Sequence, residues 1–468
     1  MVARRGRTAS DRRASRYAPL WWAAWINSRR RVGKRVAAAR FCPVVVLQSR
    51  DTRYWIADDD SHRDEFSAAA IPNGPKGARM ATGANAQYWK DARLPGVLKH
   101  SLLNRYLPVF LIRTSSRARR AAYFDGFAGR GIYENGKPGP PKQMLEFAVG
   151  QQYGYRKVPL SLFFCERDPE SFEILDQLCE HYRSKGIDVR TRRDDATAYL
   201  RGSLPAFSQI PAFLFLDPCG VGIPFEDLVA ALNRGGEKAW PPTEVMINFS
   251  LEALRRIGGV VTSPKPIEAT MKTLDTSLGG DWWRAYFQDM PPAKAVDAVV
   301  EEFGRRLEKA TGMTLIAIPV HRAPTHKPIY YLIFGTRHPA GVWNFAHCAA
   351  KATEDWWAEV RAKQEQVEGP SLFDVTPQIS EVESNAVPII AAQIQSLTRT
   401  HGEIRLGDFP GEVFGTFLGR VRDKTARAAV KHLHKAGLTP STGVGGKPED
   451  LRVAPAQDAN EDGISSHS

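Results

Sequence analysis

The sequence has no run of apolar residues long enough to cross a membrane, since a spanning helix needs about 18 or more of them. It is also poor in cysteine: five are scattered along the chain, without the CxxC spacing of redox and zinc sites. This usage argues against a disulfide framework and favours a reducing, cytoplasmic compartment. The cysteines are Cys42, Cys165, Cys179, Cys219 and Cys348.

Metal-ligand spacing is absent as well. His321, His326, His338 and His347 do not form a pattern such as HExxH, so no metal site is expected. Strong charge is missing from most of the chain. The net charge is +13, but residues 1–50 hold 13 Lys and Arg against one acidic residue, and the chain from Met80 onward carries only +3. Bulk charge therefore does not indicate nucleic-acid binding by that part.

Residues 1–80 form a basic leader without a clear repeating pattern. Three interpretations remain open. An Arg-rich, acid-poor leader is typical of transit peptides, and it is also typical of a disordered arm that binds nucleic acid. The third interpretation is a wrongly assigned start, with Met80 as the true first residue, because organised patterning begins just after it.

The chain becomes regular at Gln87. The segment 87–114 predicts a helix, because its apolar residues have the spacing of one helical face: Leu98, Leu102, Leu103, Tyr106 and Leu107. Lys99, His100 and Arg105 lie off that face. They form either a solvated rim or a surface that closes over a cofactor or a polyanionic substrate.

Short apolar runs then alternate with stretches compatible with helices. This alternation predicts βαβ units and a doubly wound, mostly parallel, Rossmann-like α/β sheet. The predicted domain spans residues 87–363. Its expected strands are 121–127, 160–168, 187–196, 211–220, 243–250 and 330–339.

Acidic residues follow several of these runs at their carboxyl ends, where doubly wound sheets bind ligands. The first run leads into a glycine turn, DGFAGRG at 125–131, whose glycines let a ligand approach the backbone closely. Glu166 at the end of the second could accept both hydroxyls of a ribose, and Asp194 or Asp195 after the third could hold an adenine amino group. Asp217-Pro218 ends the fourth run. Helix capping would explain any one of these acids, but not the whole series.

These motifs resemble those of class I S-adenosylmethionine-dependent methyltransferases. KHSLLNRYL, YFDGFAGRG, the loop at Gly139-Pro140, FFCERD, FLFLDPCGVGIPF and EVMINF are more closely similar to the three-Cys-motif partner protein family (TcmP), over residues 90–455.

The resemblance implies that S-adenosylmethionine is the cofactor and that a phage-type three-Cys-motif protein is the partner. The amino-acid end of the cofactor would lie in the turn formed by Asp125, Gly126, Phe127, Gly129 and Gly131. Glu166 would hold the ribose and Asp194 or Asp195 the adenine. Asp217-Pro218 would face the methyl acceptor.

The chain departs from one related pattern. In enzymes that methylate the amino group of adenine, the Asp-Pro or Asn-Pro pair is followed in the sequence by Pro and an aromatic residue. The aromatic residue stacks on the flipped base. Cys219-Gly220 occupy those places here. Any base stacking must then come from elsewhere, for example from Phe225. Because Cys219-Gly220 differ from this pattern, the sequence does not identify the methyl acceptor.

A second domain is predicted after an acidic, turn-rich linker at 364–386. Residues 387–455 predict a helix, a short strand-like or turn segment, a basic helix at 422–435 and a glycine-rich hairpin, the order of a winged helix-turn-helix. Arg422, Lys424, Arg427 and Lys431 on the basic helix suit contacts with DNA or RNA phosphates, although winged helices also dock proteins. The tail, 456–468, is expected to be disordered.

Two functions of different classes follow. One is a methyltransferase whose acceptor is a nucleic acid or a base-containing molecule, in a phage or mobile-element setting. The other is a non-catalytic adaptor that retains the cofactor fold and binds protein or nucleic acid through its winged helix.

Overall fold

A computed structural model describes residues 45–47, 94–114, 118–153, 158–218, 220–235, 241–264, 267–368 and 376–456. The basic leader lies outside the described residues, apart from the short strand β1 (Val45–Leu47). Met80, Cys219 and the tail from residue 457 also lie outside them. None of the described helices is long and apolar enough to span a bilayer.

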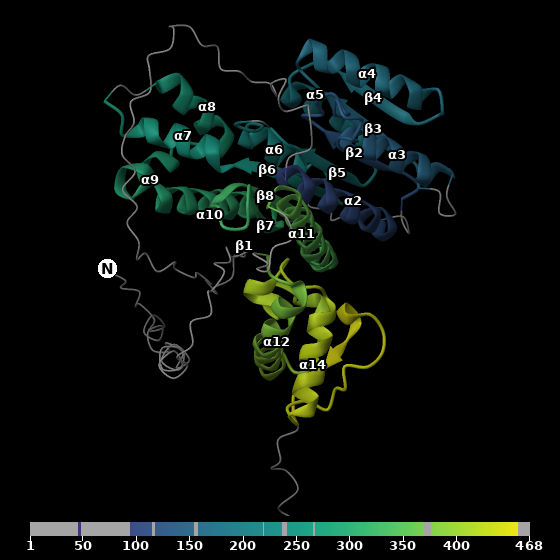
Figure 1. The fold of residues 1–468 in the computed structure, drawn as a ribbon, viewed down its shortest axis with the longest axis vertical. Coiled ribbons are helices and arrows are strands. Elements are labelled where there is room, and N and C mark those ends of the chain that lie inside the picture. Colours follow the sequence, from purple (N-terminus) through teal and green to yellow (C-terminus); the bar gives the residue numbers. More distant parts are fainter. Residues whose placement is uncertain are drawn as a thin grey trace, which may run out of the picture. The chain divides into compact units, whose positions relative to one another are not determined.

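An eight-stranded sheet runs through the described residues, in the order β1-β7-β8-β6-β5-β2-β3-β4 (Figure 1). The strands from β6 to β4 pair in parallel, β8 is antiparallel to both of its neighbours, and β1 is antiparallel to β7. The prediction of a mostly parallel α/β sheet is therefore confirmed. Its strands are β2 (Ala121–Asp125), β3 (Leu160–Cys165), β4 (Asp188–Arg192), β5 (Ala212–Leu216), β6 (Thr243–Ser250), β7 (Thr314–His321) and β8 (Pro328–Thr336).

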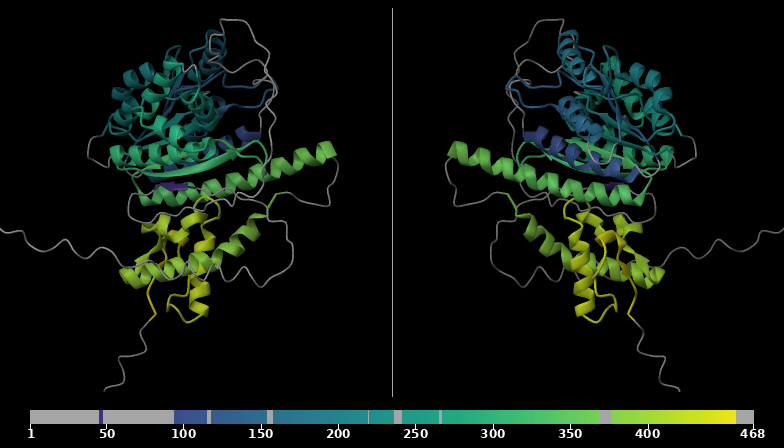
Figure 2. Two further views of the ribbon diagram at one scale, coloured as in Figure 1. Left: turned by 90° about the vertical axis from the view of Figure 1, so that its left-hand side faces the viewer. Right: turned by 90° about the vertical axis from the view of Figure 1, so that its right-hand side faces the viewer.

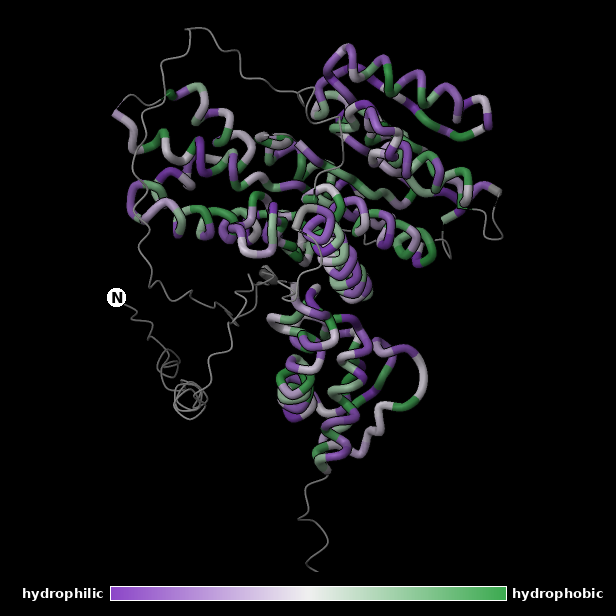
Figure 3. The backbone as a smooth tube through the Cα atoms, in the orientation of Figure 1, coloured by the Kyte–Doolittle hydropathy of each residue, from purple (hydrophilic) through white to green (hydrophobic). Residues whose placement is uncertain are grey.

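Helices cover both faces of this sheet, which is why its central strands β2, β3 and β5 are buried at every position and mostly apolar. Neighbouring residues of a strand point to opposite faces, so Tyr123 and Phe124 belong to different hydrophobic clusters. Residues of α2, α3, α4 and α11 join the cluster of Tyr123, and residues of α5 to α10 join that of Phe124. Along the helices, hydrophilic and hydrophobic residues are interspersed, as Figure 3 shows.

The helices lie close to the predicted positions. The predicted apolar face of α2 is buried at Leu98, Leu102 and Tyr106, as expected. Figure 2 shows α11 as a long helix beside the sheet, and residues 364–368 of the expected linker belong to it. The described helices up to residue 368 are α2 (Leu94–Thr114), α3 (Pro140–Tyr153), α4 (Pro169–Arg183), α5 (Ala196–Ser203), α6 (Phe225–Leu232), α7 (Leu251–Val261), α8 (Glu268–Leu278), α9 (Trp283–Asp289), α10 (Pro292–Thr311) and α11 (Pro339–Glu368).

The chain after α11 forms α12 (Ile379–His401), β9 (Ile404–Arg405), α13 (Pro410–Phe414), α14 (Lys424–Lys435) and β10 (Arg452–Val453). Both predicted helices are present. The residues at both ends of 364–386 are helical rather than turns, because the acids and glutamines there are good helix formers.

The glycine-rich hairpin expected at 441–453 is not formed. Gly443 and Gly445 have φ of 70° and 97°, values that β-strands do not use. The segment is therefore a loop up to Lys447. Its last residues form β10, which pairs with β9 in antiparallel fashion through Arg452 and Arg405.

Two adjacent glycines of α7 provide a matched test of its packing against α9. A Cβ on Gly258 would lie 2.2 Å from ring atoms of Phe287, which is buried in α9, whereas a Cβ on Gly259 would meet nothing within 4 Å. We expect Gly258→Ala to lower the free energy of unfolding by about 1–3 kcal/mol through overpacking. Gly259→Ala should raise it by about 0.4–1 kcal/mol through lost freedom of the unfolded chain. Urea unfolding of both variants measures this, and equal effects would contradict the packing described.

Candidate functional site

Acidic side chains gather at the carboxyl edge of the parallel strands. Asp125, the last residue of β2, pairs in register with Phe164 of β3 and with Phe215 of β5. Glu166 and Asp217 each follow these partners by two residues, so both lie at the same edge as Asp125. This carboxyl edge is where doubly wound sheets bind ligands.

The glycine turn after β2 begins with a buried carboxyl group. Asp125 Oδ1 accepts a hydrogen bond from the backbone N–H of Phe127 at 3.0 Å. Gly129 and Gly131 have φ of 63° and 75°, which other residues rarely adopt. A Cβ on Gly131 would also lie 2.9 Å from Leu178 of α4. The turn therefore needs glycine for its backbone conformation and for its packing.

Glu166 joins this turn to the end of β3. Its Oε2 accepts from the backbone N–H of Gly129 at 2.8 Å, and its Oε1 accepts from that of Asp168 at 2.8 Å. The N-cap of α4 is Asp168, whose side chain accepts from the N–H of Ser171. Glu166 is thus not the capping residue, and its partly exposed carboxylate lies beside the glycine turn.

The two aspartates after β4 differ in their contacts. Asp195 caps α5 by accepting from the backbone N–H groups of Thr197 and Ala198, at 2.9 and 3.3 Å. Asp194 accepts from the N–H of Asp195 at 2.8 Å and lies 3.4 Å from Arg192. The capping interpretation therefore holds for Asp195, and Asp194 remains partly exposed at the end of its strand.

Asp217, at the end of β5, lies in a nearly dry environment. It forms an ion pair with Lys99 of α2, and the two side chains are 14% and 7% exposed. Its Oδ1 accepts from Asn248 Nδ2 of β6 at 2.7 Å. Pro218, the next residue, lines a pocket between β5 and β6. Both charges of this pair are largely removed from water, which is costly unless they compensate each other.

The interpretation of Lys99 and His100 as a solvated rim is wrong, because both side chains are buried. Burial lowers the pKa of His100 to about 3, and Lys99 adds to the shift, so the imidazole is neutral at ordinary pH. Arg105 lies farther along α2 at the surface, where it forms an ion pair with Asp355 of α11 at 2.7 Å. Only the first two of the three residues therefore belong to the site.

Four polar atoms in this region are buried and have no hydrogen-bond partner among the described residues. They are Tyr123 OH, Asp125 Oδ2, His100 Nε2 and Asn248 Oδ1. Tyr123, Asp125 and His100 each interact electrostatically with Asp217, and Asn248 donates a hydrogen bond to it. All four residues therefore lie near Asp217. Buried polar groups usually have partners, and unsatisfied ones are often explained by function.

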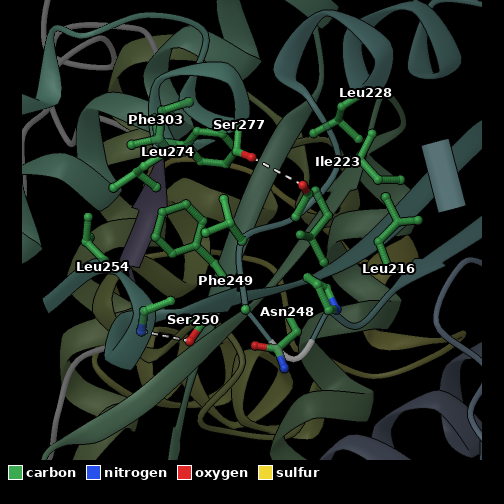
Figure 4. A pocket seen from close by; sticks show the side chains of 17 residues that line it. Leu216, Ile223, Leu228, Asn248, Phe249, Ser250, Leu254, Leu274, Ser277 and Phe303 are labelled. Carbon is green, nitrogen blue, oxygen red and sulfur yellow. Dashed lines mark hydrogen bonds between the residues drawn. The ribbon is translucent and has the colours of Figure 1, made fainter. Parts of the chain in front are cut away.

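A pocket lies next to Asp217 and extends between β5, β6, α7 and α8 (Figure 4). Its lining is mostly aliphatic and aromatic, including Leu254, Leu274 and Phe303. Phe225, which the sequence offered as a stacking residue, is not part of the lining. Its buried ring instead contacts Phe303, with 6.0 Å between the ring centroids.

The basic residues predicted to contact nucleic acid mostly have partners within the chain. Arg422 forms an ion pair with Glu383 of α12 at 2.7 Å, and Lys424 lies 3.2 Å from the same carboxylate. Arg427 donates to three carbonyl oxygens of the glycine loop, those of Gly443, Gly445 and Gly446. Lys431 is exposed on the same helix.

Asn248 and the ion pair of Lys99 were not predicted from the sequence. Asn248 left a signal, because it is a polar residue within the apolar run of β6. Lys99 left only its position off the apolar face of α2. Its partner lies 118 residues away along the chain, and helical spacing cannot identify such a contact.

Comparisons with known proteins are sparse. No protein-family model matches the chain, and no curated protein sequence matches it. Among solved structures, protein LPL1258 from Legionella pneumophila str. Philadelphia 1 is 13% identical, with a TM-score of 0.31 over 60% of this chain and 95% of that one.

Two further structures show weaker likeness. A SAM-dependent methyltransferase from Agrobacterium tumefaciens is 7% identical, with a TM-score of 0.25 over 50% of this chain and 61% of that one. The YcgJ protein from Bacillus subtilis is 13% identical, with a TM-score of 0.21 over 51% of this chain and 96% of that one. The chain is thus only weakly similar to a methyltransferase of known structure.

The buried carboxyl of Asp125 should make stability depend on pH. Burial raises its pKa to about 8, against 3.8 for an unburied aspartate. Between pH 3.8 and about pH 8, the Asp125 carboxyl binds fewer protons in the unfolded chain than in the folded one. The carboxyl group therefore lowers the stability of the fold as pH rises. We expect Asp125→Asn to gain stability relative to the natural protein from pH 5 to pH 7.5, by up to about 1.4 kcal/mol per pH unit.

Urea unfolding of both proteins across this pH range measures the difference. Glu244 and Glu308 are also buried acids with raised pKa values, but they are common to both proteins and cancel in the comparison. A difference in stability that does not change with pH would show that Asp125 is ionised throughout.

Proposed function

We propose that this chain is an S-adenosylmethionine-dependent methyltransferase of the three-Cys-motif partner type. One observation carries the proposal: the glycine turn after β2, Glu166 after β3 and Asp217 after β5 meet at one edge of a mostly parallel sheet. Such an edge suits a nucleoside cofactor whose parts lie across several strands.

The residues at this edge fit the proposed cofactor. Glu166 accepts one N–H at each oxygen, and each oxygen keeps a lone pair for a ribose hydroxyl. Gly126 and Phe127 continue the turn from Asp125, where backbone groups can approach the amino-acid end. Asp194, rather than the capping Asp195, is the better placed of the two to hold the adenine amino group.

Bound S-adenosylmethionine would supply a methyl group on an electrophilic sulfonium. The chain's own contribution is positioning, which is the main requirement of an in-line displacement. Asp217 is held by Lys99 and Asn248 at the end of β5, and Pro218 shapes the pocket beside it. His100 stays neutral, so one of its ring nitrogens can donate a hydrogen bond and the other can accept one, without a charge on the ring.

Calorimetry with S-adenosylmethionine on the full-length protein tests this proposal. We expect micromolar binding by the natural protein and at least tenfold weaker binding by Glu166→Ala, because two ribose hydrogen bonds would be lost. Glu173→Ala is the matched control, since Glu173 is an exposed residue of the neighbouring helix α4. Absence of binding by the natural protein would refute the cofactor and leave the non-catalytic adaptor as the better proposal.

We further propose that residues 387–455 form a winged helix that binds nucleic acid, and that the acceptor is a nucleic acid or a base-containing molecule. The order α12, β9, α13, α14, glycine loop and β10 supports this, as does the pairing of β9 with β10. Arg427 fixes the loop against α14, the helix that carries the exposed Lys431. The three-Cys-motif protein stays the proposed protein partner.

Lys431 provides the cleanest test of nucleic-acid contact, because it is exposed. We expect Lys431→Ala to weaken binding of single-stranded RNA or duplex DNA severalfold and to reduce the salt dependence of binding by about one unit of slope. Lys309→Ala at the exposed end of α10 should change neither. Fluorescence anisotropy at several salt concentrations measures both quantities, and identical behaviour of the two variants would contradict a role for α14.

A further inference from the structure

The turn between β7 and β8 lies at the same edge of the sheet as Asp217. β6 is parallel to β5, and β8 is antiparallel to β6 with Leu332 opposite Asn248. β8 begins four residues before Leu332, at Pro328, which therefore lies about 13 Å beyond Asn248, at about 3.3 Å per residue. The turn, residues 322–327, thus extends past the carboxyl end of β5, where Asp217 lies.

Asp217 separates this turn from the residues proposed to hold the cofactor. Asp125, Glu166 and Asp194 lie at the ends of β2, β3 and β4, and these strands are on one side of β5 in the sheet. β6, β8 and β7 are on the other side. The side of β5 that a bound cofactor would leave free is therefore the one that carries α7 and the β7–β8 turn (Figure 1).

Two contacts from α7 hold this turn in place. Arg255 donates to the carbonyl oxygen of Pro328 at 3.1 Å, and Glu252 forms an ion pair with Arg322 at 2.6 Å. The pairing of β7 with β8 is irregular next to the turn, at Val320. Irregularities of this kind are common beside active sites, where they redirect side chains. The turn is therefore an ordered part of this edge of the sheet.

The turn and the adjoining face of α7 are basic. Glu252 and Arg256 are one helical turn apart on α7, so they share a face. The ion pair of Glu252 with Arg322 therefore brings the turn beside Arg256, and Lys327 lies at the other end of the turn. Together with Arg255 the surface has four cations and one carboxylate, a net charge of +3. We call Arg255, Arg256, Arg322 and Lys327 the basic patch.

This charge is concentrated rather than typical of the chain. All of the chain from Met80 onward carries a net charge of only +3. Arg256 and Lys327 are exposed and form no ion pair with the described residues. The cations of α14 differ, since Arg422 and Lys424 share the carboxylate of Glu383. The basic patch therefore has two cations available for an anionic ligand beside the candidate site.

We propose that the basic patch binds the phosphates of a single-stranded nucleic acid, the methyl acceptor. Guanidinium and ammonium groups are the usual partners of phosphate oxygens, and such contacts fix the position of the strand without reading its bases. A base next to the bound phosphates is then free to turn toward Asp217. A single strand fits because enzymes that modify a base need it outside a duplex stack. This inference rests on the proposed methyltransferase function and adds a surface to the contacts proposed for α14.

Fluorescence anisotropy of labelled single-stranded RNA and DNA with the full-length protein tests the proposal. We expect the double variant Arg256→Ala/Lys327→Ala to bind about tenfold more weakly at low salt, because two phosphate contacts are lost. The slope of the logarithm of the binding constant against the logarithm of salt concentration should fall by about 1.4, at about 0.7 for each contact with a single strand.

Arg119→Ala/Lys309→Ala is the matched control. It removes the same two residue types, and both are exposed and precede β2 and β7, at the opposite edge of the sheet. The control should bind as the natural protein does. Equal binding by the two double variants would overturn the proposal, and so would a natural protein that binds neither RNA nor DNA.

An oligonucleotide with uncharged methylphosphonate linkages separates phosphate contacts from base contacts. We expect the natural protein and Arg256→Ala/Lys327→Ala to bind it equally, because it offers no phosphate charge to the basic patch. Weaker binding of this probe by the variant would show that the two residues contact bases instead, and would overturn the proposal.

The Tm and calorimetry with S-adenosylmethionine distinguish this inference from the proposed function. We expect both to be unchanged in Arg256→Ala/Lys327→Ala, because the basic patch and the cofactor residues lie on opposite sides of Asp217. Normal cofactor binding, with nucleic-acid binding unaffected by the variant, would overturn this inference alone. Absence of cofactor binding by the natural protein would refute the methyltransferase function and the acceptor role, and the anisotropy would still report on the phosphate contact.

Discussion

Burial of the parallel strands on both faces is the constraint on which the rest of this protein depends. Every residue of β2, β3 and β5 is buried, and nearly all of their side chains are apolar on both faces. The charged groups of the candidate site lie where these strands end. Asp125, Glu166 and Asp217 are the first acidic residues that the chain places after those buried runs, and the parallel register brings them together.

The resulting cluster is expensive in free energy. Asp125 is buried enough for its pKa to rise to about 8, and His100 enough for its pKa to fall to about 3. The ion pair of Lys99 and Asp217 joins α2 to the sheet in the same nearly dry region. A core of similar size built from apolar residues would be at least as stable. Residues with shifted pKa values thus cluster where such sheets bind ligands. This position favours a functional explanation over a structural one.

Much of the fold could be predicted from the sequence, because strand and helix patterns are local. The apolar runs ending at Asp125, Glu166 and Asp217 gave the strands, and the alternation with helices gave a parallel sheet. The environment of α2 could not be predicted in this way. Helical spacing showed that Lys99 and His100 lie off the apolar face, but not that the carboxyl edge of the sheet would bury them.

The C-terminal region shows a second limit. Its two helices were predicted from the sequence, whereas the pairing of β9 with β10 involves two residues per strand and leaves almost no pattern. Asn248 shows the opposite case. A polar residue within an apolar strand was visible in the sequence, but its importance depends on the bond to Asp217, which only the fold brings into reach.

Binding of S-adenosylmethionine at the carboxyl edge of β2, β3 and β4, as proposed, can be localised by hydrogen–deuterium exchange of the full-length protein with and without this cofactor, because the readout is resolved along the chain. We expect slower exchange on binding at 125–131, 166–168 and 194–198, with little change in α14. Unchanged exchange at these segments at saturating cofactor, or protection confined to another part of the chain, would contradict this proposal.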